Sequence, residues 1–297
     1  MIGAAFAAHN PFPKQVIYMQ HSTTSWKTGD GLTIFAQYWQ PAGPVPKAVV
    51  CFVHGIGDHS SRHVHVARAF TDAGFAFFTT DQRGHGQSQG QRGHFPSRET
   101  ILHDTDLLLQ HASELFPGLP VILYGHSMGG ILVLFYALER KPDIAGVISN
   151  SPGLHNALQK KPLLIFAARL LGSIFPRMSI SNRLDLNGIS RDPLMVQAYK
   201  SDPLIHDRIT MGLGKVMLGV TGFTMKNAAL FPLPLLMMHG REDIITYASG
   251  SEAFAAVNPG KCKLILWEKA FHEIHNEPEQ QEVMSAMTTW VQDLISR

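Results

Sequence analysis

The fold is decided by one stretch, Val121-Ile122-Leu123-Tyr124-Gly125-His126-Ser127-Met128-Gly129-Gly130. Its apolar start predicts a buried strand, and the pattern from Ile131 to Arg140 predicts a helix directly after it. The Gly-x-Ser-x-Gly motif between them allows a tight turn that strains the serine and exposes its hydroxyl, with a helix N-terminus behind it to favour developing negative charge. We therefore interpret Ser127 as a nucleophile; an ordinary helix N-cap is the weaker alternative.

The strand-helix alternation of this stretch extends along the chain from about residue 48. Short apolar runs, typical of strands covered on both faces, alternate with longer amphipathic runs. This predicts an α/β fold with a mostly parallel central sheet and helices on both faces. An antiparallel hairpin around Gly29-Asp30-Gly31 is expected at one sheet edge. The expected strands are 16–22, 32–39, 48–53, 75–80, 121–124, 144–149, 233–239 and 262–267, and the expected helices are 61–73, 98–116, 128–140, 248–257 and 278–295.

The alternation stops between Ser151 and Leu230, where the sequence is helical in pattern and broken by Pro and Gly. We interpret residues 151–230 as a helical cap inserted into a core domain formed by 1–150 and 231–297. Arg169 is the single charge between Leu163 and Phe175. Such a helix can lie on a lipid surface or be buried against the core domain, and the spacing of its apolar residues does not distinguish the two alternatives.

Composition excludes several classes of function. Apolar residues make up 45% of the 297 residues and the net charge is +2, with no basic run, so no nucleic-acid partner is expected. The 16 histidines form no metal-binding motif with the two cysteines or with glutamate, so no metal is expected.

The two cysteines, Cys51 and Cys262, lie far apart in apolar stretches and suit a reducing compartment. The apolar start from Met1 to Ala8 lacks the basic region and the length of an export signal, and no apolar run has the length of a transmembrane helix. We expect a cytoplasmic protein that can also contact a membrane surface peripherally, and the oligomeric state stays open.

The catalytic partners of Ser127 follow from chain order, because folds with this turn place the acid after the serine and the histidine after the acid. Asp243 comes just past an apolar strand, at the sheet edge where ligand sites collect, with Glu242 as a weaker rival. His272 lies in a loop before the last helix and is favoured as the base over His275.

An oxyanion hole needs one backbone N–H from the residue after the nucleophile and one from an earlier loop. Met128 supplies the first. Ile56 is the natural second donor, because the glycines of His54-Gly55-Ile56-Gly57 let the backbone approach a substrate; a plain turn is the alternative.

Four blocks taken together resemble the monoacylglycerol lipase family, from about residue 16 to the C-terminus. They are His54-Gly55-Ile56-Gly57-Asp58-His59-Ser60, Asp81-Gln82-Arg83-Gly84-His85-Gly86-Gln87-Ser88, the Gly125 to Gly130 turn, and Ser201-Asp202-Pro203-Leu204. The resemblance implies an α/β-hydrolase fold, the triad Ser127, Asp243 and His272, and oxyanion donors Ile56 and Met128.

The resemblance also implies an acyl tunnel formed by a cap that can touch membranes, and alcohol-binding roles for Arg62, His126 and Tyr199. Asp58 departs from the family, which more often has Glu at this position, so a shorter carboxylate stands where the family makes its headgroup contact. We interpret Asp81 and Arg83 as members of an ion pair that stabilises their turn.

These observations predict a serine-dependent lipase that hydrolyses monoacylglycerol through an acyl-enzyme, with a lipid ester as its partner and no cofactor. An apolar cap over the serine independently favours a long acyl chain, since each buried methylene contributes about 0.8 kcal/mol. The alternatives are a lysophospholipase or broad carboxylesterase, an acyltransferase, and a non-catalytic ligand-binding relative of the hydrolases.

Overall fold

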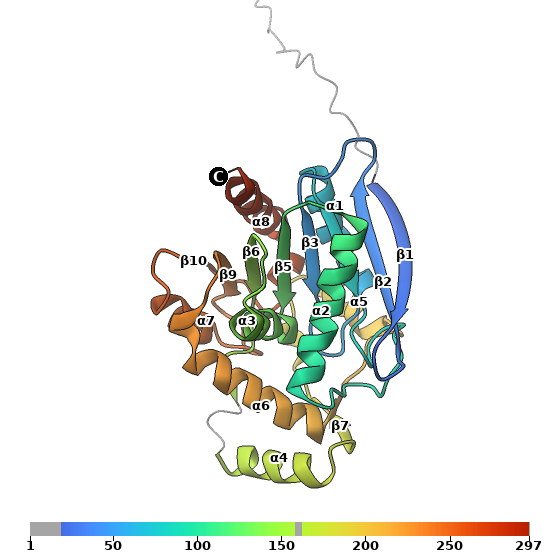
Figure 1. The fold of residues 1–297 in the computed structure, drawn as a ribbon. Helices are drawn as coiled ribbons and strands as arrows, with labels where there is room; N and C mark the ends of the chain where they lie inside the picture. The colour runs from blue at the N-terminus through green and yellow to red at the C-terminus, as the bar shows by residue number, and fades with distance from the viewer. Residues whose placement is uncertain (1–18, 158–161, 297) are drawn as a thin grey trace, which may run out of the picture.

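The computed structural model describes residues 19–157 and 162–296 and contains a sheet in the order β1-β2-β4-β3-β5-β6-β9-β10 (Figure 1). The first two strands form an antiparallel hairpin, and β2 pairs antiparallel with β4. The other pairings are parallel, so the predicted mostly parallel sheet is confirmed. The strands are β1 (Met19–Lys27), β2 (Thr33–Pro41), β3 (Val49–Val53), β4 (Ala76–Thr80), β5 (Val121–His126), β6 (Gly146–Asn150), β9 (Leu235–Gly240) and β10 (Cys262–Trp267).

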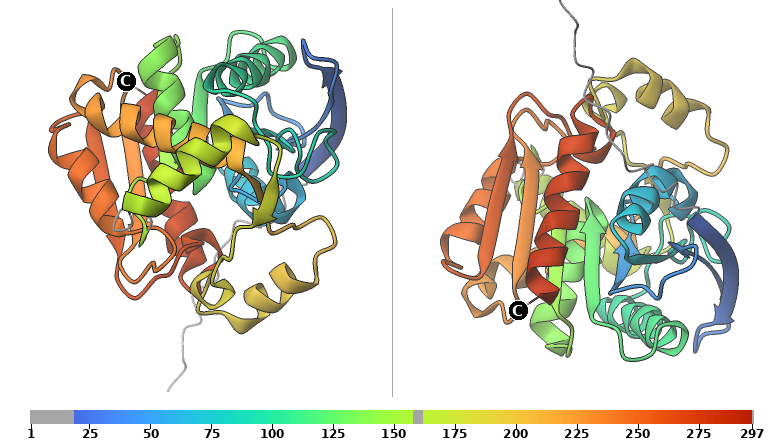
Figure 2. Two further views of the ribbon diagram at one scale, coloured as in Figure 1. Left: turned by 90° about the horizontal axis from the view of Figure 1, so that it is seen from below. Right: turned by 90° about the horizontal axis from the view of Figure 1, so that it is seen from above.

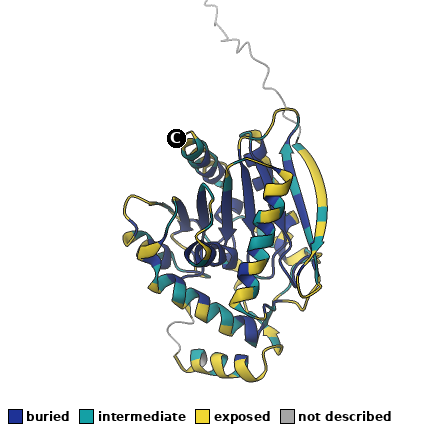
Figure 3. Cartoon of the chain, in the orientation of Figure 1, coloured by how far each residue is buried: buried dark blue, intermediate teal, exposed yellow. Residues whose placement is uncertain are grey.

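Helices cover both faces of this sheet (Figure 2). One face packs against α1 (Val64–Asp72), which follows the short 3-10 helix η1 (Ser60–His63), and against α8 (Gln280–Ile295). The other face packs against α2 (Arg98–Leu115), α3 (Met128–Arg140) and α7 (Ala248–Ala256). Every residue of β3, β4, β6 and β9 is buried, which explains the unbroken apolar runs of these strands (Figure 3).

The predicted hairpin differs from the observed one in its first strand. Residues 16–18 lie outside the described residues, and β1 continues five residues beyond the predicted end at Ser22. Most of β1 is exposed because it is an edge strand, so its outward residues are polar and hide the strand pattern. Trp26 is one of its inward residues, with its ring 6.1 Å from that of Phe78.

Residues 151–230, which we call the insert, lie between β6 and β9. In Figure 1 its helices α4 and α6 lie beyond the end of β5 at which α3 begins, and the left view of Figure 2 shows them crossing that end of the sheet. The helix α6 packs on α3, and α4 packs on α6. The elements of the insert are α4 (Pro162–Ile174), β7 (Ser179–Ser181), η3 (Leu186–Gly188), α5 (Pro193–Ser201), β8 (Arg208–Thr210), α6 (Met211–Lys226) and η4 (Ala228–Leu230).

The helix α4 is not buried against the core, which answers a question that its sequence left open. Its far side carries an exposed apolar row, from Leu163, which is 85% exposed, and Phe166, which is 67% exposed, to Leu170 and Ile174. Across the described part of the chain, no helix combines the length and the apolar character that crossing a bilayer requires.

Two glycines make the turn between β5 and α3 possible. A Cβ atom on Gly129 would lie 2.0 Å from the carbonyl oxygen of Val53, and one on Gly125 would lie 2.2 Å from the carbonyl oxygen of Gly129. Real Cβ atoms do not approach backbone this closely. The helix α3 can therefore enter close to β3 only because both positions lack a side chain.

We expect Gly129→Ala to lower the free energy of unfolding by about 1–3 kcal/mol, because the new methyl group must push α3 away from Val53. The matched control is Gly219→Ala in α6, where an added Cβ meets nothing within 4 Å. There the same change removes a helical glycine and should stabilise by about 0.5–1 kcal/mol. Urea unfolding of both variants measures the difference, and equal effects would contradict this account of the turn.

Candidate active site

Ser127 stands at the turn between β5 and α3 with φ 57° and ψ −114°. This backbone conformation is strained for a residue with a side chain. Its backbone N–H donates to the carbonyl oxygen of Asn150 at 2.9 Å, and its side chain makes no capping hydrogen bond to α3. The N-cap alternative therefore does not describe Ser127, whose hydroxyl is left available to another partner.

That partner is His272. Its Nε2 lies 2.9 Å from Ser127 Oγ, and its Nδ1 lies 2.7 Å from Asp243 Oδ2. Asp243 follows β9 and His272 follows β10, so two adjacent parallel strands deliver the acid and the histidine to the same end of the sheet. The other carboxylate oxygen of Asp243 accepts hydrogen bonds from the backbone N–H groups of Ile245 at 2.8 Å and Thr246 at 2.9 Å.

The environment separates the proton affinities of the acid and the base. Burial by itself would raise the pKa of Asp243, but the charge of His272 and hydrogen bonds from His239 and His272 hold this pKa below its ordinary range. Burial by itself would lower the pKa of His272, but the charge and hydrogen bond of Asp243 raise it above 6.5. Asp243 is thus ionised while His272 gains basicity, as proton removal from a serine requires.

The two weaker candidates lie elsewhere. His275 is fully buried, and its Nδ1 lies 3.1 Å from the side-chain nitrogen of Asn150. Glu242 is exposed to solvent. Neither side chain takes part in the hydrogen-bonded line from Asp243 to Ser127.

The two residues expected as oxyanion donors, Ile56 and Met128, both lie beside Ser127. Met128 is the first residue of α3, so its N–H has no partner within the helix. Ile56 lies in the loop after β3, and this loop approaches so closely that a Cβ on Gly55 would lie 3.2 Å from the Cβ of Ser127. Ile56, Ser127 and Met128 line one cavity together.

This cavity has a volume of about 600 Å³ and a largely apolar wall. The floor beside Ser127 includes Ile131 and Thr246, and the insert supplies much of the rest. From α6 the wall takes Gly214, Met217, Leu218, Thr221, Gly222 and Met225. A volume of this size suits a small-molecule ligand with an apolar chain.

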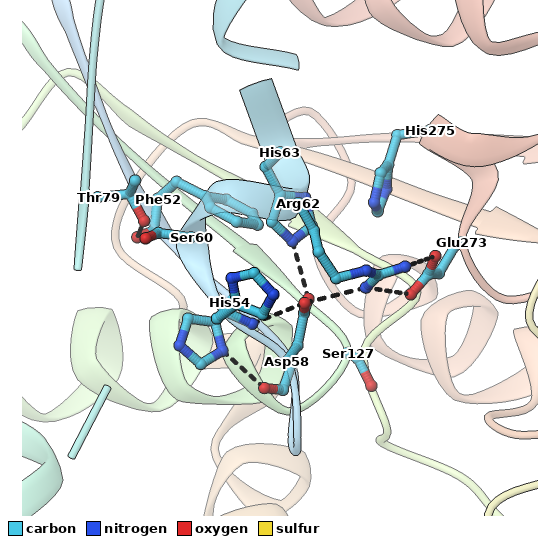
Figure 4. Close-up of polar contacts among 12 residues, drawn as sticks. Phe52, His54, Asp58, Ser60, Arg62, His63, Thr79, Ser127, Glu273 and His275 are labelled. Carbon is cyan, nitrogen blue, oxygen red and sulfur yellow. Dashed lines mark hydrogen bonds and ion pairs between the residues drawn. The ribbon is translucent and has the colours of Figure 1, made fainter. Parts of the chain in front are cut away.

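The residues expected at an alcohol-binding end do not line this cavity. Arg62 instead forms ion pairs with Asp58 at 2.9 Å and with Glu273 at 2.9 Å (Figure 4). Its guanidinium also lies 4.6 Å from the centre of the Tyr199 ring. Burial would lower the pKa of Arg62, but the two carboxylates raise it. The ring of His126 is buried and lies 4.9 Å from that of His272.

Tyr199 lines a second, smaller cavity of about 330 Å³. Asn182 and Leu184 line both cavities, so the two adjoin each other within the insert. Asp58 is 3% exposed and is held by His63 at 2.8 Å as well as by Arg62. The shorter carboxylate is therefore satisfied inside the protein.

The predicted pairing in the turn from Asp81 to Ser88 is wrong in its partners. Arg83 pairs with Asp30 at 2.8 Å and with Asp104, whereas Asp81 accepts hydrogen bonds from Ser60 and from the backbone N–H of Gln87. The carboxylate of Asp81 thus accepts hydrogen bonds from backbone N–H groups in two turns, those of Ser60 and Gln87. Arg83 links Asp30, in the turn of the first hairpin, to Asp104 on α2.

Sequence reasoning missed three side chains of the site. Thr246 Oγ1 lies 2.8 Å from Asp243 Oδ2, His239 Nε2 lies 3.1 Å from the same oxygen, and Glu273 binds Arg62. All three lie close to a predicted triad residue along the chain, since Thr246 and His239 flank Asp243 and Glu273 follows His272, but this proximity does not show which side chains make contact.

The loop that carries His272 is held by the insert. The backbone N–H groups of His272 and Glu273 donate to the carbonyl oxygens of Gly188 at 3.1 Å and Ile189 at 2.8 Å. Ser190 Oγ donates to the carbonyl oxygen of Asn276 at 2.8 Å. The insert thus contributes to the position of the histidine as well as to the cavity wall.

Comparison with known proteins gives this geometry a family. Residues 44–279 match the family described as serine aminopeptidase, S33. The chain is 37% identical over 280 residues to an uncharacterized abhydrolase domain-containing protein of Dictyostelium discoideum, of which it spans 30%, with 93% of the chain covered. It is 33% identical over 263 residues to the monoacylglycerol lipase of Mycolicibacterium smegmatis, covering 88% of the chain and 93% of the relative.

A solved structure agrees with the sequence comparisons. The crystal structure of the Paleococcus ferrophilus monoacylglycerol lipase matches with a TM-score of 0.78 and 31% identity, over 93% of this chain and 99% of that one. The mostly parallel sheet, the strand-turn-helix at Ser127 and these matches agree with one another. The chain belongs to the monoacylglycerol lipase family of the α/β-hydrolase fold, and it is a hydrolase acting on carboxylic esters.

Proposed function

We propose that the protein hydrolyses monoacylglycerols to a free fatty acid and glycerol through an acyl-enzyme on Ser127. The observation that carries this proposal is the hydrogen-bonded line from Asp243 through His272 to Ser127, which ends at the apolar cavity. The names of the relatives support the glyceride as substrate, since two of the matched proteins are monoacylglycerol lipases.

In the acylation half-reaction, Ser127 Oγ attacks the ester carbonyl while His272 Nε2 takes its proton. Asp243 stabilises the resulting imidazolium and keeps the ring in the tautomer with hydrogen on Nδ1. The negative charge that develops on the carbonyl oxygen is stabilised by the N–H groups of Ile56 and Met128. His272 then returns its proton to the glycerol oxygen, and the carbon–oxygen bond breaks to release glycerol.

Deacylation repeats these steps with water. His272 removes a proton from water as the oxygen attacks the acyl carbonyl, and the tetrahedral intermediate again uses the same two N–H groups. When it collapses, Ser127 regains the proton from His272 and the fatty acid leaves. The reaction requires only the side chains and backbone groups named here.

The insert serves in this proposal as a cap, residues 151–230, over a core formed by 1–150 and 231–297. It is the insert that supplies the α6 wall of the cavity, and burying each methylene of an acyl chain there contributes about 0.8 kcal/mol. The apolar lining accordingly supports a long acyl group.

The charges near the catalytic histidine favour an uncharged alcohol. Arg62 faces two carboxylates, Asp58 and Glu273, so its positive charge is already compensated before any substrate binds. A phosphate headgroup gains little from a guanidinium in this state and would meet the uncompensated negative charge of the pair. This supports glycerol over the phosphorylated headgroup of a lysophospholipid. The alcohol-binding roles of Arg62, His126 and Tyr199 remain part of this proposal, although the three side chains lie outside the cavity at Ser127.

We also propose that the protein contacts membrane surfaces transiently through α4. The exposed row from Leu163 to Ile174 continues into Phe175 and Met178, which are also exposed. A helix that exposes such an apolar face can bind the boundary between headgroups and acyl chains. Docking there would bring the cavity close to lipid esters.

The triad predicts the pH dependence of hydrolysis. kcat/KM should rise with pH as His272 loses its proton, with an acid limb above pH 6.5 because Asp243 raises the pKa of His272. Asp243→Asn removes this charge, so the acid limb should move to lower pH and kcat should fall by about 10³–10⁴-fold. Glu242→Gln, at the exposed neighbouring carboxylate, is the control and should change neither. An acid limb at the same pH in the wild type and in Asp243→Asn would contradict the geometry.

Substrate comparison tests the proposed function directly. With one acyl chain throughout, we expect kcat/KM for 1-monoacylglycerol to exceed that for lysophosphatidic acid by about tenfold or more, and Ser127→Ala to lose both activities. Glu273→Gln should narrow the difference in kcat/KM between the two substrates, because Asp58 alone then balances Arg62 and the cluster no longer repels a phosphate. Glu268→Gln, at an exposed glutamate, is the control. Cleavage of the lysophospholipid without cleavage of the monoacylglycerol would refute the choice of substrate.

Vesicle binding tests the membrane contact. Replacing Phe166 and Leu170 by Ser should weaken binding to phosphatidylcholine vesicles by at least about tenfold, since each side chain contributes about 1.5–3 kcal/mol when buried. Hydrolysis of a short, water-soluble ester should be unchanged. Leu194→Ser, at an equally exposed leucine of α5, is the control in sedimentation with vesicles. Equal binding by all three proteins would exclude α4 as the contact.

A further inference from the structure

We propose that His239 is a positioning residue of the active site, whose imidazole holds the carboxylate of Asp243 in the orientation that His272 requires. This inference rests on the triad proposed above. It assigns a role to a second histidine that no step of the reaction uses.

His239 is the penultimate residue of β9, and its side chain is fully buried. Its Nε2 lies 3.1 Å from Asp243 Oδ2 and 3.0 Å from the carbonyl oxygen of Thr246. Its Nδ1 lies 2.8 Å from the hydroxyl oxygen of Ser251 on α7. The ring therefore bridges the strand, the loop with the catalytic acid, and the helix after that loop.

The contacts fix the tautomer of this ring. A carbonyl oxygen can only accept a hydrogen bond, and so can the ionised carboxylate of Asp243. Nε2 of His239 must therefore carry hydrogen and donate to both. Nδ1 is then free to accept from the hydroxyl group of Ser251, which completes both ring nitrogens without any water.

The hydrogen bond of His239 acts on the catalytic oxygen itself. Asp243 Oδ1 is fixed by the backbone N–H groups of Ile245 and Thr246, whereas Oδ2 is the atom that receives Nδ1–H of His272. His239 and the hydroxyl group of Thr246 are the other donors at Oδ2. Together they resist rotation of the carboxylate, which would otherwise lengthen the bond to His272.

A hydrogen bond at this oxygen also has an electrostatic effect. The positive end of the His239 N–H dipole points at Oδ2 and weakens the attraction of the carboxylate for protonated His272. Losing this donor should raise the pKa of His272, whereas rotation of the carboxylate away from His272 should lower it, so loss of His239 is expected to displace this pKa. The other charged or titratable groups around His272, namely Glu273, Asp58 and His126, stay unchanged in such a variant.

The alternative is that His239 only fills space at the end of β9. A pure packing role affects stability and the amount of folded enzyme, but it does not move the pH profile of each active molecule. The acid limb of kcat/KM, measured per active site, therefore separates the two roles.

The experiment compares His239→Leu with His239→Gln in the full chain, using a 4-nitrophenyl ester and active sites counted with a fluorophosphonate probe. Leucine fills the volume without a donor, and we expect kcat/KM to fall about tenfold, with the acid limb displaced from its wild-type pH. Glutamine can place an N–H near Nε2 of the histidine and should restore both values. Wild-type behaviour of His239→Leu, or no rescue by His239→Gln, overturns the proposal.

Two further variants make the result decisive. Val291→Ala opens the core around α8, away from the triad, and should lower stability without moving the acid limb. If His239→Leu does not fold, Ser251→Ala takes its place. Without its Ser251 partner the ring can tilt, so a smaller displacement of the acid limb in the same direction as in His239→Leu is expected, and no displacement overturns the proposal. Activity that survives in Ser127→Ala would instead overturn the triad itself.

Discussion

Ser127 has a φ of 57° in the turn between β5 and α3. This turn requires glycine at positions 125 and 129, because backbone carbonyl oxygens lie too close to both positions to leave room for a side chain. The tightness of this turn brings the start of α3 against the end of β3. Ser127 occupies the N-cap position of α3, but in this conformation its hydroxyl does not cap the helix. The free Met128 N–H and the neighbouring Ile56 loop follow from the same close approach.

Around this turn the chain separates apolar and charged surfaces. The apolar cavity lies on the α6 side of Ser127, whereas Arg62, Asp58 and Glu273 form a nearly closed cluster of charges near His272. Within the cluster, Arg62 binds Glu273 from a position 211 residues away in the chain, and the three charged side chains bind one another. Ser127 therefore lies between an apolar wall that suits a hydrocarbon chain and a cluster of charges that already neutralise one another in large part.

The sequence predicted the central part of the fold because strands covered on both faces must be apolar along their whole length. The predicted starts of β6 and β9, at Ile144 and Leu233, are two residues earlier than the observed ones. Both residues are apolar and pack against the core, but they do not pair with a neighbouring strand. The solvent-facing end of β1 carries no such signal. Candidates for nucleophile, base and acid followed from a rigid chain order, and the structure brings those three side chains within hydrogen-bonding distance.

The supporting residues could not be found in the same way. The contacts of Glu273 with Arg62, and of Thr246 and His239 with Asp243, depend on how loops from different strands meet, and a single sequence contains no measure of that. Arg83 illustrates the limit, because its partners Asp30 and Asp104 lie 53 and 21 residues away, whereas the motif suggested a neighbour.

The hydrogen bonds from His272 and Glu273 to Gly188 and Ile189 bear on how such proteins can diversify. A cap is usually regarded as a module that recombination can exchange to give a conserved core a new substrate. Here the exchanged segment would also have to reproduce two carbonyl groups that fix the histidine loop. Chimaeric proteins that fold and function should therefore keep residues 188–190 together with the core. Only the segments of the insert before and after these residues can then be exchanged freely.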